Sequence, residues 1–323
     1  MRICIYGAGA MGTSLGVLLS RVGAQYDLVS RNCEHVSALR EQGGILKFAN
    51  ETVCSKVSAL LPEEMEGEYD LIILSTKQRD NRTVAEQIKP YLSHGGAVLT
   101  VQNGLPEEGL AEVFGVDAIY GGVLSWGAER EEAGVVKLTS NSGFHIGLGA
   151  FGAGEKLGEI AELLSKVFTV TTGNLCELRF AKLATNACFS TLSTISGLPF
   201  GALAKKYRRD CMRLIREIFA VARAYGAKKL PLNGHDLFQV FSFCGGILLP
   251  VAMKHYRNTY SGMLRDLEAG RRCDIDYVAG AAVVAAQRKG VEVPYLERAV
   301  ELVHDIENGL AEIAPETLKL LKI

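Results

Sequence analysis

The sequence predicts an α/β fold made of a doubly wound, mostly parallel sheet followed by an all-helical C-terminal domain. Over residues 1–173, short apolar runs of strand type alternate with segments of helical character, which is typical of a parallel sheet with helices on both faces. After about residue 173, glycine-punctuated strands give way to long segments of helical period. The length of 323 residues also fits two domains of roughly 100 to 200 residues each. We therefore expect one domain over residues 1–173 and a second over residues 174–323.

The first domain begins with a strand, a glycine turn and a helix. Residues 2–6 form a short apolar run, residues 7–12 read GAGAMG, and residues 14–19 have helical character. Further strands are expected at residues 25–29, 69–74, 97–101, 118–120, 135–138 and 145–148, a helix at 34–41, and a short β excursion at 45–58. Because strands and helices alternate, most of the strands should run parallel.

The second domain is expected to consist of helices. Residues 208–225 and 274–289 repeat their apolar positions with a helical period, and residues 178–186 open the helical half. The sequence has no internal repeat, no low-complexity tract and no long Pro/Ser linker.

The composition argues against several classes of protein. Lys and Arg number 35 against 36 Asp and Glu, and the resulting net charge of -1 does not favour nucleic acid or an anionic membrane as a partner. Hydrophobic residues at 48% and charged residues at 22% are typical of a globular protein. The longest uncharged stretches, residues 187–204 and 237–253, are interrupted by glycine, proline or hydroxyl residues. A membrane span needs about 20 predominantly apolar residues, so neither stretch is expected to be one.

The cysteines and histidines predict no metal site. The eight cysteines form no CxxC pair, and the six histidines show no spacing with carboxylates or cysteines that suits a metal ion. The chain starts without a signal peptide, so the cysteines are interpreted as reduced thiols of a cytoplasmic protein.

The glycine turn at residues 7–12 predicts a dinucleotide site of the Rossmann type. Gly7 would make the tight turn, Gly9 would let the backbone approach a pyrophosphate, and Gly12 would let the helix pack closely on the strand. The helix that follows would present free N–H groups to the phosphates. An ordinary tight turn is the alternative, but the motif follows a strand and opens a helix.

The end of the second strand favours NADP(H) over NAD(H). An Asp or Glu at this place accepts a hydrogen bond from the ribose 2′-hydroxyl, whereas an arginine suits a 2′-phosphate. Here the strand ends with Val29, Ser30, Arg31 and Asn32. Arg31 can make charge-assisted contacts with a phosphate, unless it is only a solvated surface residue.

One face of the first helix in the second half carries polar groups. Lys182, Asn186 and Ser190 stand at i, i+4 and i+8, so they share a helix face. A cationic donor beside neutral hydrogen-bonding groups suits a substrate with a carboxylate and a carbonyl. A solvated surface charge is the alternative interpretation of Lys182.

Seven segments in this order and spacing carry a family resemblance. They are GAGAMG at 7–12, Arg31, Thr76 with Lys77, VQNG at 101–104, KLATN at 182–186, SGMLRD at 261–266 and DIDY at 274–277. With them the chain resembles the ketopantoate reductases (2-dehydropantoate 2-reductases) of the 6-phosphogluconate-dehydrogenase-like superfamily. The resemblance covers essentially the whole chain.

The resemblance implies that a hydride passes from NADPH to a 2-keto carbon while a proton is supplied to the oxygen. Lys182 matches the general acid of the family. The matching cofactor contacts are Gly7, Ala8, Gly9, Ala10, Met11, Gly12, Arg31, Lys77, Asn103, Ala128 and Asp274. The matching or adjacent substrate contacts are Asn103, Lys182, Asn186, Ser190 and Ser261. Free lysine titrates near 10.4, so partial burial would help to bring its pKa towards the working pH.

The departures from the family leave the substrate open. Ser190 and Phe200 stand where the family has asparagines, Gly262 stands where it has a serine beside Ser261, and Asp274 replaces a glutamate. Losing a matched hydrogen bond changes specificity by orders of magnitude, so the substrate is ketopantoate or another branched or aromatic 2-oxo acid.

A non-catalytic NADP-binding sensor is a further alternative, which would need the glycine turn and Arg31 but not Lys182. Helical second domains in this superfamily often dimerise, so a homodimer is the expectation from analogy alone.

Overall fold

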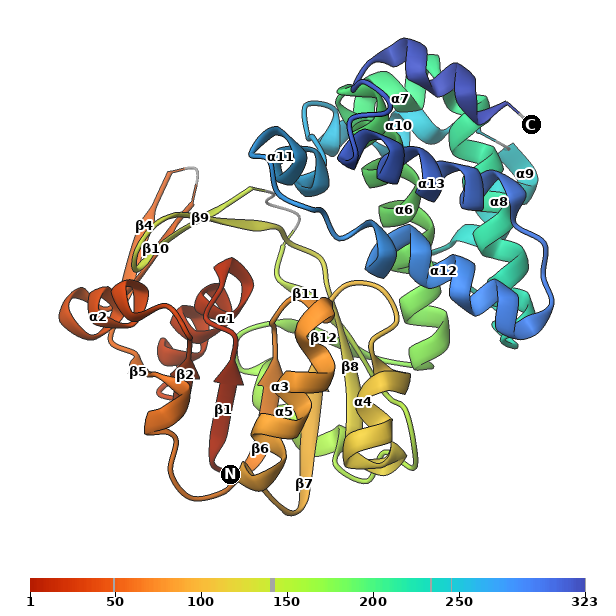
Figure 1. Cartoon of the computed structure of the whole chain (residues 1–323). Helices are drawn as coiled ribbons and strands as arrows, with labels where there is room; N and C mark the ends of the chain where they lie inside the picture. The colour runs from red at the N-terminus through yellow and green to blue at the C-terminus, as the bar shows by residue number, and fades with distance from the viewer. Residues whose placement is uncertain (49, 140–142, 233, 245, 323) are drawn as a thin grey trace. The chain divides into compact units, whose positions relative to one another are not determined.

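The computed structural model describes residues 1–48, 50–139, 143–232, 234–244 and 246–322. The chain divides into two compact units (Figure 1). Unit 1 comprises Met1–Gln102 and Pro106–Leu175, and unit 2 comprises Asn103–Leu105 and Cys176–Ile323. The domain boundary expected after residue 173 stays a prediction.

Unit 1 is built on an eight-stranded sheet with the order β12-β11-β8-β7-β6-β1-β2-β5. Its strands are β1 (Ile3–Tyr6), β2 (Tyr26–Val29), β5 (Ser58–Leu60), β6 (Tyr69–Leu74), β7 (Leu92–Thr100), β8 (Ile119–Leu124), β11 (His145–Ala150) and β12 (Thr169–Thr172). Neighbouring strands run parallel, except that β8 and β11 are antiparallel. The prediction of a mostly parallel sheet is therefore confirmed.

Helices cover both faces of this sheet. They are α1 (Ala10–Ser20), α2 (Cys33–Gln42), α3 (Asn81–Ile88), α4 (Glu107–Phe114) and α5 (Leu157–Ser165). Because side chains alternate along a strand, Ile3 and Ile5 of β1 point into one core with α1, α2 and α5. Cys4 and Tyr6 point into the other core with α3 and α4. This two-sided burial explains why β1 reads as an unbroken apolar run.

A second, four-stranded sheet in unit 1 has the order β4-β3-β10-β9. It contains β3 (Gly44–Lys47), β4 (Thr52–Ser55), β9 (Ala128–Glu132) and β10 (Val135–Leu138). The β excursion and the strand near residue 135 were expected, whereas β9 and β12 were not. β9 reads AEREE and β12 reads TVTT, and both are sheet edges with mostly exposed residues, so neither carries an apolar pattern.

Unit 2 is helical around its own hydrophobic core. Its helices are α6 (Leu175–Ser196), α7 (Phe200–Lys206), α8 (Arg208–Ala224), α9 (Leu237–Cys244), α10 (Leu249–Ala252), α11 (Gly262–Glu268), α12 (Ile275–Lys289) and α13 (Pro294–Glu307). Helices α8, α12 and α13 pack on one another (Figure 1). The predicted helical domain is confirmed, with one departure. The two-residue strands β13 (Pro231–Leu232) and β14 (His235–Asp236) pair with each other.

Short 3₁₀ turns complete the described structure: η1 (Pro62–Glu64), η2 (Gln78–Asp80), η3 (Lys89–Tyr91), η4 (Val116–Ala118), η5 (Lys254–Tyr256) and η6 (Pro315–Leu321). Helix α6 ends at Ser196, just before Gly197, whose φ of 67° lies in the left-handed region, and Pro199 follows. No single helix in the described part of the chain is long and apolar enough to cross a membrane. Only α6 and α7 taken together pass by length and composition, and they meet at 94°.

Candidate active site

The glycine turn of unit 1 has the geometry of a phosphate-binding loop. Gly7 has a φ of +110°, and a Cβ there would lie 2.7 Å from the backbone nitrogen of Thr76. A Cβ on Gly12 would overlap the carbonyl oxygen of Gly7, whereas a Cβ on Gly9 would meet nothing within 4 Å. The first and third glycines are therefore needed for the turn and for close packing, and the second faces open space.

Helix α1 begins at this open side, and its first turn carries no carboxylate that would compete with a phosphate for the backbone N–H groups. Its N-cap, Gly9, makes no side-chain cap, and the first turn contains no acidic residue. The first N–H groups of a helix have no partner inside the helix, so the start of α1 presents donors and a positive dipole end. A dinucleotide pyrophosphate fits this arrangement.

The remaining residues of the turn play different parts. Ala8 is 2% exposed and its N–H donates to the carbonyl of Val29 at 2.9 Å, so it fastens the turn to β2. Ala10 and Met11 are half-buried at the start of α1. Ala128 is the first residue of β9, which packs against α1. Lys77 is exposed at the start of η2. Their roles in binding a cofactor stay predictions.

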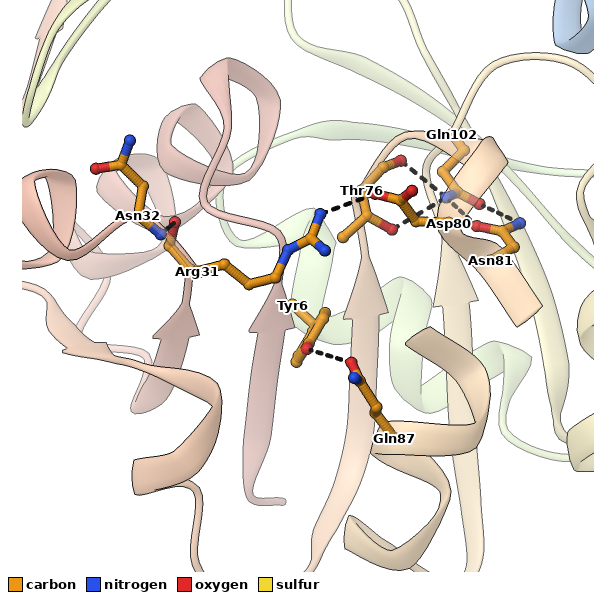
Figure 2. A network of polar contacts seen from close by, with 9 residues as sticks. Tyr6, Arg31, Asn32, Thr76, Asp80, Asn81, Gln87 and Gln102 are labelled. Atoms are coloured by element: carbon orange, nitrogen blue, oxygen red, sulfur yellow. Dashed lines mark hydrogen bonds and ion pairs between the residues drawn. The ribbon is translucent and has the colours of Figure 1, made fainter. Parts of the chain in front are cut away.

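Arg31 follows β2, as the sequence indicated, and its guanidinium is held by a carboxylate. Its Nη2 lies 2.8 Å from Oδ2 of Asp80, which belongs to η2 after β6 (Figure 2). The Arg31 side chain is 68% exposed and that of Asp80 29% exposed. Asp80 was not foreseen, because 49 residues separate it from Arg31 and no local pattern marks it.

Gln102 ties together the ends of two neighbouring strands. It follows β7, is 7% exposed, and donates from Nε2 to the carbonyl of Thr76 at 2.8 Å and to Oδ1 of Asn81 at 2.6 Å (Figure 2). Asn81 donates back from Nδ2 to Oε1 of Gln102 at 3.1 Å. This network of hydrogen bonds fixes the chain on either side of Lys77 and just before Asn103. Gln102 lies in the VQNG motif of the sequence, but no local pattern indicated this role.

Helix α6 of unit 2 presents the predicted polar face. Lys182, Asn186 and Ser190 are half-exposed, whereas the intervening Ala184 and Ala187 are buried. Although the Lys182 side chain is not fully covered, desolvation by the surrounding protein lowers the pKa of its ammonium below the ordinary value. The shared face is confirmed, and the roles of its residues stay predictions.

Two of the predicted substrate residues touch each other within unit 2. Asn186 donates from Nδ2 to Oδ1 of Asn103 at 3.3 Å, and Asn103 is exposed. Two amides next to a helix face with a lysine supply both donors and acceptors for a small polar acid.

Ser261 has a structural task that the sequence did not reveal. It is 1% exposed and is the N-cap of α11, where its hydroxyl accepts from the N–H of Met263 at 3.1 Å. The hydroxyl of Thr194 also donates to it at 3.1 Å. The role of Ser261 in binding a substrate stays a prediction. Gly262 is exposed, and a Cβ there would meet nothing within 4 Å.

The other departures lie at different places in unit 2. Phe200 begins α7, and its ring centroid is 5.7 Å from that of Phe189 in α6. Asp274 is half-exposed at the N-cap position of α12.

Within the described residues, no group of three or more His, Cys, Asp or Glu side chains is placed to hold a metal ion.

Comparison with known proteins shows the family. The model of the ketopantoate reductase PanE/ApbA family matches residues 3–150, and the model of its C-terminal part matches residues 174–307. The chain belongs to the ketopantoate reductase family. It is therefore an oxidoreductase of the class that acts on CH–OH groups, with a nicotinamide-binding domain of the Rossmann type.

Its relatives include two curated 2-dehydropantoate 2-reductases. The protein of Lactococcus lactis is 27% identical over 317 residues, covering 96% of this chain and 99% of the relative. That of Pyrococcus abyssi is 28% identical over 299 residues, covering 91% of this chain and 94% of the relative.

Two solved structures show the same fold over nearly the whole chain. A D-mandelate dehydrogenase with NADH and anilino(oxo)acetate has a TM-score of 0.83 at 27% identity and covers 96% of this chain and 99% of its own. A 2-dehydropantoate 2-reductase from Geobacter metallireducens GS-15 has a TM-score of 0.82 at 28% identity, covering 94% and 99%. Proteins of this fold therefore include both a D-mandelate dehydrogenase and a 2-dehydropantoate 2-reductase.

Proposed function

We propose that this protein reduces 2-dehydropantoate (ketopantoate) to pantoate with NADPH, a step of pantothenate and coenzyme A synthesis in the cytoplasm. The observation that carries the proposal is the polar face of α6, where Lys182 has a lowered pKa one helical turn from Asn186, which bonds Asn103. The match to curated 2-dehydropantoate 2-reductases over 91–96% of the chain supports the choice of substrate.

Most of the residues expected to hold the cofactor belong to unit 1. When bound, the reduced nicotinamide supplies a hydride. The turn at residues 7–12 and the start of α1 would hold the pyrophosphate, and Arg31 would contact a 2′-phosphate.

Lys182 supplies the proton. A keto oxygen gains negative charge as its carbon is reduced, and a placed ammonium both stabilises that charge and gives up its proton. The lowered pKa makes this transfer easier than from a fully solvated lysine. Asn103 and Asn186 would orient the acid so that its carbonyl oxygen faces Lys182.

An aromatic 2-oxo acid is the second candidate substrate. Phe200 and Ser190 replace amides of the family pattern, and the fold matches a D-mandelate dehydrogenase with a TM-score of 0.83. A phenyl ring suits an apolar side chain better than the hydroxyl of ketopantoate does.

The loss of NADPH absorbance with ketopantoate, phenylglyoxylate and branched 2-oxo acids in parallel tests the proposal. We expect turnover of ketopantoate with the highest kcat/KM. A higher kcat/KM for phenylglyoxylate would show that the substrate is an aromatic 2-oxo acid, which the protein reduces by the same chemistry. Tight NADPH binding without turnover of any acid would contradict the catalytic role and favour a sensor.

A further inference from the structure

We propose that Asp80 is a specificity-determining residue for the cofactor, which holds Arg31 in an ion pair and thereby lowers the preference for a dinucleotide carrying a 2′-phosphate. The inference rests on the proposed function in one respect, namely that a nicotinamide dinucleotide binds at the glycine turn.

The ion pair spans the carboxyl edge of the sheet. Arg31 follows β2, Asp80 follows β6, and β1 lies between these two strands in the sheet order. Figure 2 shows the Arg31 side chain reaching past the end of β1 and above Tyr6 to the carboxylate of Asp80. The distance from Nη2 of Arg31 to Oδ2 of Asp80 is 2.8 Å. The guanidinium is therefore drawn away from the end of its own strand, where a 2′-phosphate is recognised in this fold.

The pair joins two groups with opposite cofactor preferences. A carboxylate accepts from a ribose 2′-hydroxyl and repels a 2′-phosphate, whereas an arginine binds the phosphate. Here β2 supplies the arginine and the segment after β6 supplies the acid. A 2′-phosphate must compete with Asp80 for Arg31 and also meets its negative charge. A cofactor with a free 2′-hydroxyl is not affected in either way. Asp80 therefore reduces the difference in binding affinity between NADPH and NADH.

The fold does not depend on this ion pair. Asp80 precedes α3, yet its side chain makes no cap hydrogen bond to that helix. The Arg31 side chain is 68% exposed, and exposed ion pairs contribute little to stability. Asp80→Asn keeps the size of the side chain and removes only its charge, so this variant should fold.

Binding of NADP⁺ and of NAD⁺ to the full-length protein, measured by titration calorimetry without substrate, tests the inference. We expect Asp80→Asn to tighten NADP⁺ binding by about tenfold, because one negative charge near the 2′-phosphate is removed. NAD⁺ should bind equally or more weakly. Glu86→Gln is the matched control, since Glu86 is an exposed carboxylate on α3 whose partner is Arg82. It should leave both affinities unchanged.

A second variant keeps the test sharp. Arg31→Gln should abolish most of the preference for NADP⁺. In the Arg31→Gln background, Asp80→Asn should increase the affinity for NADP⁺ by less than it does in the wild type. An unchanged ratio of the two affinities in Asp80→Asn, or an equal change in Glu86→Gln, would overturn the inference. Because no turnover is measured, a protein that shows the expected shift but reduces no 2-oxo acid would support this inference and contradict only the proposed reaction.

Discussion

The environment of Lys182 is suited to a proton donor. It shares a face of α6 with Asn186 and Ser190, while the neighbouring alanines are buried. Desolvation lowers its pKa, so the protein lowers the cost of removing its proton. A proton donor to a developing alkoxide requires a lowered pKa and neighbouring polar groups that hold the substrate. An ordinary surface lysine has neither of these two features.

Replacing Lys182 with Ala should lower kcat by about 10²- to 10⁴-fold, the contribution of a placed general acid. Binding of NADP⁺ should stay nearly unchanged, because the proposed cofactor contacts lie mainly on unit 1. Steady-state kinetics and calorimetry check the two parts. Lys205→Ala, which removes an exposed lysine of α7, is the control and should keep full turnover. Near-normal kcat in Lys182→Ala would refute the proposed role.

At neutral pH His35 is uncharged in the folded protein, because burial disfavours its charged form and Nδ1 accepts a hydrogen bond. It is fully buried, and Nδ1 accepts from the N–H of Gly134 at 2.9 Å, so Nε2 carries the proton towards Thr13 Oγ1 at 3.2 Å. Burial, with a smaller contribution from Arg130, lowers its pKa from 6.5 to about 4. The unfolded chain therefore binds a proton more readily than the folded protein between these values.

Stability should fall as the pH falls from 6.5 to about 4, by up to about 3 kcal/mol from this group. Urea unfolding at pH 7.5 and at pH 4.5 measures the loss. His35→Gln removes the titrating group, so its free energy of unfolding should change less between the two pH values than that of the wild type. The same comparison with the exposed His145→Gln should leave the pH dependence intact. Equal pH dependence in wild type and His35→Gln would contradict this account.

At the scale of elements, helix α13 takes its N-terminal cap from another helix. Glu217 of α8 accepts from the N–H groups of Tyr295 at 3.0 Å and Leu296 at 2.7 Å. Pro294, at the first helical position, has no N–H to satisfy. One carboxylate thus serves both remaining donors and fixes α13 against α8.

Glu217→Ala should destabilise unit 2 by about 1 to 2 kcal/mol, since a helix loses its cap and a favourable charge at its positive end. Glu217→Gln keeps one acceptor and should lose less. Glu301→Gln, at an exposed position on α13, should change the free energy of unfolding by less than about 0.5 kcal/mol. Urea denaturation followed by circular dichroism gives the three values. A loss in Glu217→Ala no larger than that in the control would rule out the capping role.

On the scale of the whole molecule, the two units have separate hydrophobic cores, and the glycine turn belongs to unit 1 alone. A dinucleotide bound there should stabilise unit 1 by mass action. At 100 times the dissociation constant the gain is about 2.7 kcal/mol. Hydrogen exchange should slow in residues 7–12 and in α1 when NADP⁺ is added, which mass spectrometry can follow.

Gly9→Asp offers a sharp control for this prediction. Gly9 has an ordinary φ of -76° and open space around its Cβ position, so aspartate should fit without strain. Its carboxylate would stand where the pyrophosphate is expected and repel it. The variant should fold like the wild type but lose the protection by NADP⁺. Full protection in Gly9→Asp would place the cofactor elsewhere.

Much of this protein can be predicted from contiguous residues. The apolar run of β1, the glycine turn and the polar face of α6 are all written in neighbouring positions, because backbone propensity and side-chain periodicity act over a few residues. The order of such motifs along the chain also indicated the family. Edge strands such as β9 escaped prediction, since an exposed strand needs no apolar pattern.

Contacts between distant segments decided the rest. The partner of Arg31 is Asp80, the cap of α13 is Glu217, and Ser261 is buried where the hydroxyl of Thr194 donates to it. Each depends on where folding brings a side chain that lies far away in the sequence, and no local pattern encodes that distance. The sequence thus specified which chemical groups the protein carries, whereas packing determined which of them are held, neutral or exposed, and hence which are free to meet a cofactor or an acid.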